Sequence, residues 1–244
     1  RRMGHRDEGQ SMKEKAYFNW SGGKDSALAL YKAMQAGDYE IITLFTVMRA
    51  ADRRVSMHEV PLELIQKQAD SLGLPLTVCY IDPCASSEEY AAAMRRQTQV
   101  FLNQGITTAL FGDIHLEPLR GRREQNCAAA GLKAAFPLWG RQPQALLREF
   151  IELGFRAVIT CADGAVLDKR YVGRLLDEDF IRELPPGADI CGENGEYHAF
   201  AFDGPVFRRP VDFRTGEVFF QDFPYEGETP SRRIWYMALT EQKG

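Results

Sequence analysis

The sequence predicts an α/β fold: a parallel β-sheet with helices on both faces, followed by a smaller C-terminal α+β lobe. Three observations predict it. Short apolar runs alternate with helical patterns through the first half of the chain, which is typical of βαβ units. From His198 onward the pattern changes to strands separated by Asp-Gly and Thr-Gly pairs, which favour turns. No low-complexity linker or internal repeat interrupts the 244 residues, so we expect two packed lobes rather than tethered domains.

The first half contains four predicted strands and three predicted helices. Runs of apolar, β-branched and aromatic residues predict strands at 15–20, 41–47, 74–81 and 107–112. Helical spacing and terminal glycines predict helices at 26–36, 59–73 and 86–105, the last opened by serine caps. Ligands of parallel sheets bind at the carboxyl ends of the strands. The segments SGGKDS, VMRA and GDIH, which follow three of these strands, are therefore expected to meet.

The second half keeps the alternation for a while. It predicts a helix at 143–154, a strand at 155–162 and a helix at 177–187 that Pro-Pro-Gly stops. We expect residues 1–12 to be a disordered or vector-derived extension. The first lobe then spans 13–125 and the second lobe 126–244.

Composition limits the class of protein. The chain has 45% hydrophobic and 26% charged residues, as soluble globular proteins do, and a formal net charge of −4 that gives no footprint for DNA. No apolar run reaches the roughly 18 residues of a membrane span. The five cysteines are odd in number and scattered, which predicts reduced thiols in a cytoplasmic protein. The four histidines lack zinc-type spacing, so we expect no structural metal.

The turn after the first strand carries the strongest chemical signal. Two glycines between a strand and a helix let backbone N–H groups converge on an anion at the positive end of the helix dipole. Hydroxyls and a lysine add donors and charge. The expected phosphate-binding residues are Ser21, Gly22, Gly23, Lys24, Asp25 and Ser26. The alternative is a plain helix cap by Asp25 or Ser26, which would need neither Lys24 nor a second glycine.

The turn fits neither the Walker A loop nor the dinucleotide-binding glycine pattern, because the lysine is followed by Asp25 and the spacing differs. It resembles the S-G-G-x-D-S motif of the PP-loop (N-type) ATP pyrophosphatases, whose sheet is of the HUP type. Residues 112–160 and 187–207, with the motif Gly-Glu-x-Gly-Glu-Tyr, resemble the diphthine–ammonia ligase family. The resemblance extends from about Lys15 to about Val211.

That resemblance implies an ATP-dependent ligase. Members adenylylate the carboxylate of diphthine, a modified histidine of elongation factor 2, and ammonia then displaces AMP. ATP and Mg²⁺ are the implied cofactors, with Mg²⁺ held mainly through phosphates rather than by a protein cage. Free ammonia is the expected nitrogen donor, because no cysteine stands in a recognisable nucleophile setting. DNA and membranes are not expected partners, and a homodimer is compatible with this interpretation.

The resemblance also implies roles for individual residues. Lys24 and Asp25 would act on the phosphates, with Thr46 and Met48 near the adenine and Gly112 and Asp113 near the ribose and α-phosphate. The acceptor site would be formed by Glu193, Gly195, Glu196 and Tyr197, with Glu193 and Glu196 also in catalysis. Carboxylates and an aromatic face suit the trimethylammonium group of diphthine. The alternative for this motif is a surface turn with solvated glutamates.

Several residues stay open. Arg120, Arg122 and Arg123 are expected either to hold phosphates or carboxylates or to form a charged helix face. His58 resembles a family position, and a core or capping histidine is the equal alternative. Asn194 stands where many eukaryotic relatives carry glycine, which points to a bacterial or archaeal branch. A bacterial chain would need another acceptor, since bacteria lack diphthamide.

Two other functions remain as alternatives. A related pyrophosphatase could thiolate tRNA, but such enzymes usually carry paired cysteines, and the closest pair here, Cys79 and Cys84, is not C-x-x-C. A nucleotide-binding module of the universal-stress type would share the sheet. It would have no use for the second lobe and its glutamates.

Overall fold

The computed structural model describes residues 12–225 and 228–242. Its elements, in chain order, are β1 (Glu14–Asn19), α1 (Lys24–Ala36), β2 (Tyr39–Arg49), α2 (Leu62–Leu72), β3 (Leu76–Ile81), α3 (Ser87–Asn103), β4 (Thr108–Leu110), α4 (Glu117–Ala129), β5 (Lys133–Ala135), α5 (Pro143–Glu152), β6 (Arg156–Asp163), α6 (Glu178–Glu183), β7 (Tyr197–Asp203), β8 (Phe213–Tyr225) and β9 (Glu228–Glu241). The expected extension lies, apart from Met12, outside the described residues. No helix of the described ranges is long and apolar enough to span a membrane.

The first lobe is a five-stranded sheet in the order β3-β2-β1-β4-β5, and every pair in it is parallel. This confirms the predicted α/β class. The carboxyl ends of β1, β2 and β4 therefore lie at one edge, as expected for the segments that follow them. The VMRA segment differs in detail, because β2 continues through Arg49 and includes most of it.

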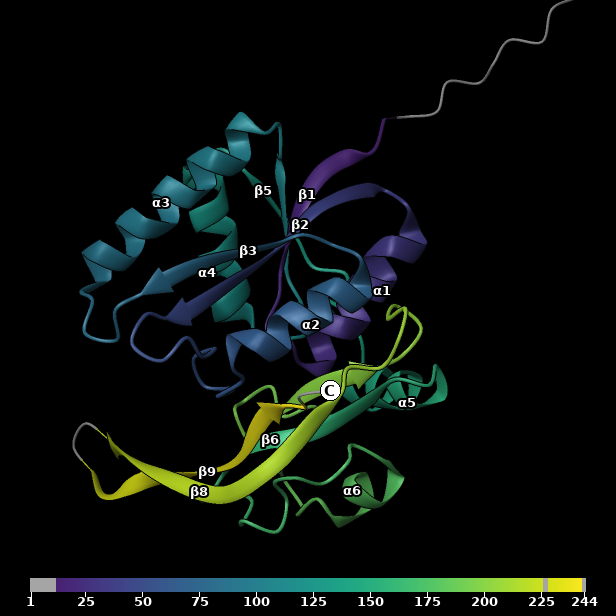
Figure 1. Ribbon diagram of the computed structural model, residues 1–244, viewed down its shortest axis with the longest axis vertical. Coiled ribbons are helices and arrows are strands. Elements are labelled where there is room, and N and C mark those ends of the chain that lie inside the picture. Colours follow the sequence, from purple (N-terminus) through teal and green to yellow (C-terminus); the bar gives the residue numbers. More distant parts are fainter. Residues whose placement is uncertain (1–11, 226–227, 243–244) are drawn as a thin grey trace, which may run out of the picture.

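Helices cover both faces of this sheet (Figure 1). Alternate side chains of β1 point into different cores: Phe18 packs in a core with α1 and α2, and Tyr17 packs in a second core with Phe101 of α3 and Cys127 of α4. The first core continues into β6 and β7, so the two lobes share apolar packing. The second lobe therefore has a fixed position beside the carboxyl edge of the parallel sheet.

The second lobe is an antiparallel sheet in the order β7-β6-β9-β8, with α5 and α6 beside it. The predicted Asp-Gly turn is confirmed at Asp203, which ends β7. The predicted Thr-Gly turn is wrong. Thr215 and Gly216 lie inside β8, where the pairing with β9 shifts register between Thr215 and Val218. A Thr-Gly pair is compatible with a bulge as well as a turn, and the long partner strand β9 decides between them.

Local signals set most helix ends. Gly37 ends α1 in the left-handed conformation, and Ser86 begins α3 with a complete capping box to Glu89. The sequence patterns predicted neither α4 as an element nor β5. The expected division after residue 125 falls inside α4, and β5 completes the parallel sheet. We therefore propose that the lobes divide between residues 136 and 142.

Candidate active site

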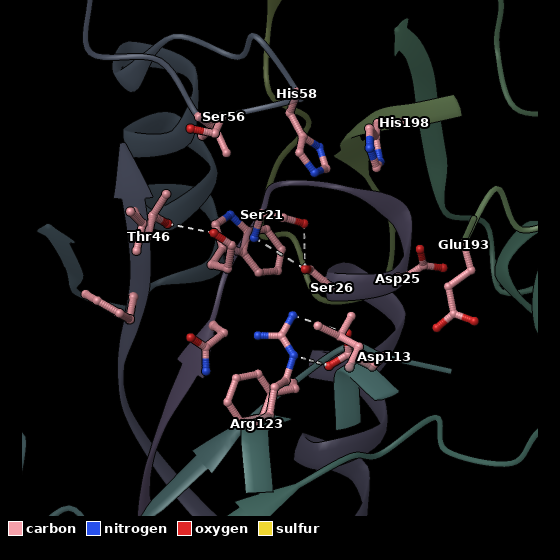
Figure 2. A pocket seen from close by; sticks show the side chains of 18 of the residues that line it. Ser21, Asp25, Ser26, Thr46, Ser56, His58, Asp113, Arg123, Glu193 and His198 are labelled. Carbon is pink, nitrogen blue, oxygen red and sulfur yellow. Dashed lines mark hydrogen bonds and ion pairs between the residues drawn. The ribbon is translucent and has the colours of Figure 1, made fainter. Parts of the chain in front are cut away.

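A cavity of about 360 Å³ opens at the carboxyl edge of the parallel sheet, a volume in the range of small-molecule sites (Figure 2). Both lobes line it. The first lobe contributes the ends of β1 and β2, the start of α1 and the segment after β4, and the second lobe contributes Gly192, Glu193 and His198. Its position follows from the topology, because the strands that end there are adjacent in the sheet.

The glycine-rich turn forms one wall of this cavity. The hydroxyl oxygens of Ser21 and Ser26 lie 2.8 Å apart and both face the cavity. Gly23 is the N-cap of α1, and no side chain caps the helix. The capping alternative for Asp25 or Ser26 is therefore wrong, and the helix begins at Lys24, two residues earlier than expected. An uncapped helix N-terminus between two hydroxyls suits a bound anion.

Gln68 holds this turn in place. Its side chain is fully buried; Nε2 donates to the carbonyl oxygens of Gly22 (2.9 Å) and Ala201 (2.6 Å), and Oε1 accepts from Trp20 Nε1 (2.8 Å). One amide thus links the loop, the residue that follows β1, and β7. Gln68 is not among the site residues that the sequence predicts. The available signal was a glutamine on the apolar face of an amphipathic helix, next to Ile65.

Lys24 and Asp25 occupy the first turn of α1 in different ways. Asp25 lines the cavity, whereas the Lys24 side chain is buried behind it. The Lys24 ammonium donates to Asp25 (2.7 Å) and to the carbonyl oxygen of Cys191, and lies 5.1 Å from the centre of the Tyr197 ring. Burial opposes its charge, but the neighbouring Asp25 holds the Lys24 pKa above its usual value. Lys24 is thus a cationic link between the lobes.

The opposite end of the cavity carries an ion pair. Arg123 of α4 meets Asp113 through Nε (2.6 Å) and Nη2 (3.2 Å), and its guanidinium lies 4.5 Å from the centre of the Phe111 ring. Burial raises the Asp113 pKa, and Arg123 counteracts this rise. A Cβ on Gly112 would lie 3.2 Å from Ser26 N, so this glycine permits the close approach of the segment after β4 to the first turn of α1.

Of the three arginines left open by the sequence, the structure brings only Arg123 to the cavity. Arg120 packs over the Trp139 ring at 4.6 Å and pairs with Glu124 at 2.7 Å, and Arg122 is exposed. Trp139 packs against the Phe136 ring.

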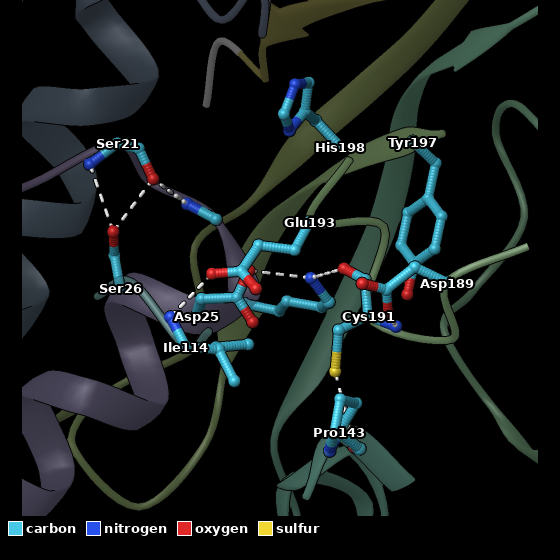
Figure 3. A network of polar contacts seen from close by, with 12 residues as sticks. Ser21, Asp25, Ser26, Ile114, Pro143, Asp189, Cys191, Glu193, Tyr197 and His198 are labelled. Atoms are coloured by element: carbon cyan, nitrogen blue, oxygen red, sulfur yellow. Dashed lines mark hydrogen bonds and ion pairs between the residues drawn. The ribbon is translucent and has the colours of Figure 1, made fainter. Parts of the chain in front are cut away.

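Glu193 reaches from the second lobe to the segment after β4 (Figure 3). Its carboxylate accepts hydrogen bonds from the backbone N–H groups of Ile114 (2.6 Å) and His115 (3.1 Å). It also lies 2.5 Å from His115 Nδ1. Burial raises the Glu193 pKa, and these donors oppose the rise. Glu193 therefore fastens the second lobe to the strand end that also carries Asp113.

The chain is similar to known proteins over most of its length. Residues 13–134 match the family model of the diphthamide synthase N-terminal domain, and residues 142–225 match that of the diphthamide synthase C-terminal domain. The diphthine–ammonia ligase of Danio rerio is 30% identical over 214 residues, which cover 78% of this chain and 83% of that protein. The Homo sapiens enzyme is 28% identical and covers 81% and 82%.

The chain belongs to the diphthine–ammonia ligase family. Membership confirms the expected family and enzyme class, an ATP-dependent ligase that forms carbon–nitrogen bonds. Among solved structures, the U34-tRNA thiolase NcsA from Methanococcus maripaludis with its [4Fe-4S] cluster is 15% identical, with a TM-score of 0.37 over 59% of this chain and 58% of that one. A likeness at this level says nothing about function.

Within the Gly-Glu-x-Gly-Glu-Tyr motif of the ligase family, only the first glutamate and the glycine before it line the cavity. Glu196 is buried, and its Oε1 accepts from Asp189 N (3.0 Å) and Asn194 Nδ2 (3.3 Å). Tyr197 is 1% exposed, with its hydroxyl donating to Ile190 O at 2.6 Å. Gly195, with φ of 91°, shapes the turn between them. These three residues thus lie behind the wall that Glu193 forms.

Of the two residues expected near the adenine, only one lines the cavity. Thr46 lines the cavity, and its hydroxyl donates to Trp20 O at 2.7 Å. Met48 is fully buried in the core and is not among the residues that line the cavity.

Within the described residues, one group of side chains has the spacing of metal ligands: His115, Asp189 and Glu193, with ligand atoms within 4.8 Å of one another. Both ring nitrogens of His115 already face a carboxylate, with Nε2 lying 3.4 Å from Asp189 Oδ2. His115 thus contacts both carboxylates directly. These contacts give no reason to replace the expectation that Mg²⁺ is held through phosphates.

Proposed function

We propose that this protein is an amide-forming ligase that adenylylates a diphthine-like carboxylate and lets ammonia displace AMP. The observation that supports this best is one cavity built from both lobes, with the phosphate loop on one wall and Glu193 of the family motif on another. An amine can displace a carboxylate oxygen once that oxygen is linked to AMP, because AMP is a good leaving group. The protein's task is then to position the reactants and to stabilise charge.

In this proposal the acceptor carboxylate attacks the α-phosphorus, and pyrophosphate leaves with the electrons of the broken bond. The hydroxyls of Ser21 and Ser26 and the N-terminus of α1 would hold the pyrophosphate. Ammonia then attacks the acyl carbon; the C–O bond to AMP breaks, and one proton leaves the nitrogen. Mg²⁺, when bound, would supply neutralising charge to the phosphates.

Different parts of the cavity would hold the rest of ATP. We propose that Thr46 and the backbone of β2 near Met48 face the adenine, and that Gly112 and Asp113 face the ribose and α-phosphate. Asp113 suits this place because Arg123 holds its carboxylate in one orientation. The acceptor would enter beside Glu193, whose 10% exposed side chain faces the cavity.

The test is direct. Purified protein is incubated with ATP, ammonium chloride and elongation factor 2 carrying diphthine. We expect AMP, pyrophosphate and the mass decrease that replacement of a hydroxyl by an amino group causes. Glutamine in place of ammonium should not support the reaction. Absence of acceptor-dependent AMP with diphthine, while ATP still binds, would reject diphthine and keep the ligase class.

A paired substitution separates the roles of the two glutamates. Glu196→Gln keeps the acceptor oxygen for the Asp189 N–H and lies away from the cavity, so we expect ATP affinity and acceptor-dependent AMP release near wild type. Glu193→Gln weakens two charge-assisted hydrogen bonds to the segment after β4, roughly 1–3 kcal/mol in total. We expect slower AMP release and weaker acceptor binding, both measurable by calorimetry and AMP assay. Equal effects of the two variants would contradict this division.

Thiol reactivity tests the thiolation alternative. Burial raises the pKa of the Cys161 and Cys191 thiols to about 12, so their thiolates are scarce at pH 8. Cys84 is exposed. Titration of the native protein with DTNB at pH 8 is expected to show one fast thiol, which Cys84→Ser removes. A fast phase that survives this substitution and disappears in Cys191→Ser would put a reactive thiol beside the site and favour sulfur chemistry.

A further inference from the structure

Two histidines line the cavity without a role so far. His58 precedes α2 and His198 lies in β7, and their rings stack with centroids 4.2 Å apart and planes 26° apart. In Figure 2 they lie on one side of Ser21, with Asp113 and Arg123 on the other. The pair is thus at the end of the cavity away from the place proposed for the ribose.

The pair lies over the phosphate loop. The His58 Cε1 atom is 3.6 Å from the point that a Cβ on Gly23 would occupy, and Ala199 O, next to His198, is 3.1 Å from it. His58 Nδ1 is buried and has no hydrogen-bond partner among the described residues. His58 thus places a buried ring nitrogen without a hydrogen-bond partner next to an uncapped helix N-terminus, which is a place where an anion would bind.

The charge of the cavity wall explains why such a group would be needed. Among the described residues that line it, the charged ones are Asp25, Asp113, Glu193 and Arg123. Arg123 is paired with Asp113, and the Lys24 ammonium faces Asp25 and Cys191 from behind the wall. A pyrophosphate group would therefore meet more carboxylates than cations. The histidines are the remaining side chains here that can gain a positive charge near neutral pH.

The surroundings keep both rings neutral while no anion is bound. Burial and the Lys24 charge lower the His58 pKa to about 4, and burial, His58, Lys24 and Arg232 of β9 hold the His198 pKa well below its usual value. The other titratable groups packed nearby are Glu59, which is paired with Arg49, and the neutral Cys161 thiol of β6. A bound polyanion would offset the charges of Lys24 and Arg232 and so favour protonation of the two histidine rings.

We propose that His58 and His198 form a phosphate-contacting pair that binds the pyrophosphate portion of ATP and takes up a proton as it does so. This rests on the proposed function only in that ATP is the substrate. The proton bound with the nucleotide would remain beside the leaving pyrophosphate and balance part of its charge. Nucleotide binding would therefore weaken as pH rises through the raised pKa of the liganded pair.

The test uses inorganic pyrophosphate and AMP as separate probes, so no acceptor is needed. Calorimetry at pH 7 in two buffers of different ionisation enthalpy measures proton uptake, and NMR of ¹⁵N-labelled histidine in the wild-type protein reports each ring. We expect pyrophosphate to move the His58 and His198 resonances toward the imidazolium form, with net proton uptake. AMP alone should cause little uptake.

Substitutions of the two histidines show how much each contributes to pyrophosphate binding. His58→Phe and His198→Phe keep a flat ring for stacking and should each weaken pyrophosphate binding roughly 10- to 100-fold, the loss of a charge-assisted contact, with AMP affinity unchanged.

Several outcomes would overturn the inference. If pyrophosphate binds and the histidine resonances do not change, the histidine proposal is rejected and the proposed function is not. Unaltered pyrophosphate affinity in both variants has the same consequence. If either variant fails to fold, the wild-type resonances still decide. A wild-type protein that binds neither ATP nor pyrophosphate would reject both this inference and the proposed function.

Discussion

Lys24→Met is expected to reduce AMP and pyrophosphate formation by roughly 100- to 1,000-fold, the range seen when a preorganised electrostatic contact is removed from a site. The ammonium holds two groups at once: the Asp25 carboxylate, which lines the cavity, and the carbonyl oxygen of Cys191, which precedes Gly192 and Glu193. Methionine fills the space but donates no hydrogen bond to the Asp25 carboxylate or to the Cys191 carbonyl oxygen. Asp25 would turn from its place, and the second lobe would lose its link to α1.

Stability should fall less than activity in this variant. Asp25 is 35% exposed toward the cavity, so water can solvate its carboxylate after Lys24 is lost. We expect a loss of about 1–3 kcal/mol in the free energy of unfolding, measured with urea. The control is Lys32→Met on the same helix, which breaks a partly exposed pair with Glu149 of α5. That change should cost less than about 1 kcal/mol and leave turnover unchanged. Full turnover in Lys24→Met would remove this residue from the mechanism.

Gly22→Ala is expected to be the most damaging glycine substitution in the phosphate loop. Gly22 has φ of 81°, and an added Cβ would lie 2.7 Å from Ile65 Cδ1 and 2.8 Å from Gln68 Oε1. The left-handed backbone costs an L-residue about 1–2 kcal/mol. Overpacking adds about 1–3 kcal/mol, because Gln68 is fixed by three hydrogen bonds and cannot move without losing one.

Gly37→Ala is the matched control for this effect. Gly37 ends α1 with a similar φ of 75°, but an added Cβ would meet nothing within 4 Å. It should show the backbone cost alone, about 1–2 kcal/mol, and normal ATP affinity. Gly22→Ala should in addition weaken ATP binding, because movement of Gln68 displaces the loop. Equal unfolding free energies and equal ATP affinities in the two variants would show that the Gln68 contact does not position the loop.

The sequence by itself determined the elements whose signals are local. The alternation of apolar runs with helical spacing predicted the parallel sheet, Gly37 predicted the end of α1, and Ser86 the start of α3. The glycine-rich turn was recognisable because phosphate binding needs a particular backbone conformation, and that conformation restricts the residues that can form it. Glu193 was found through the family motif that contains it.

The tertiary structure decided what depends on partners distant in sequence. Thr215 and Gly216 become a bulge only because β9 pairs with them, and β5 is a strand only because β4 lies beside it. Gln68 holds the phosphate loop through hydrogen bonds to residues far away in the sequence. Arg123, His58 and His198 line the cavity because the fold brings α4, the segment before α2 and β7 together there, which no local pattern encodes. Tyr197 shares a motif with Glu193 but is buried under Lys24. Neighbouring residues in a turn point in different directions, and packing between the lobes selects which of them faces the substrate.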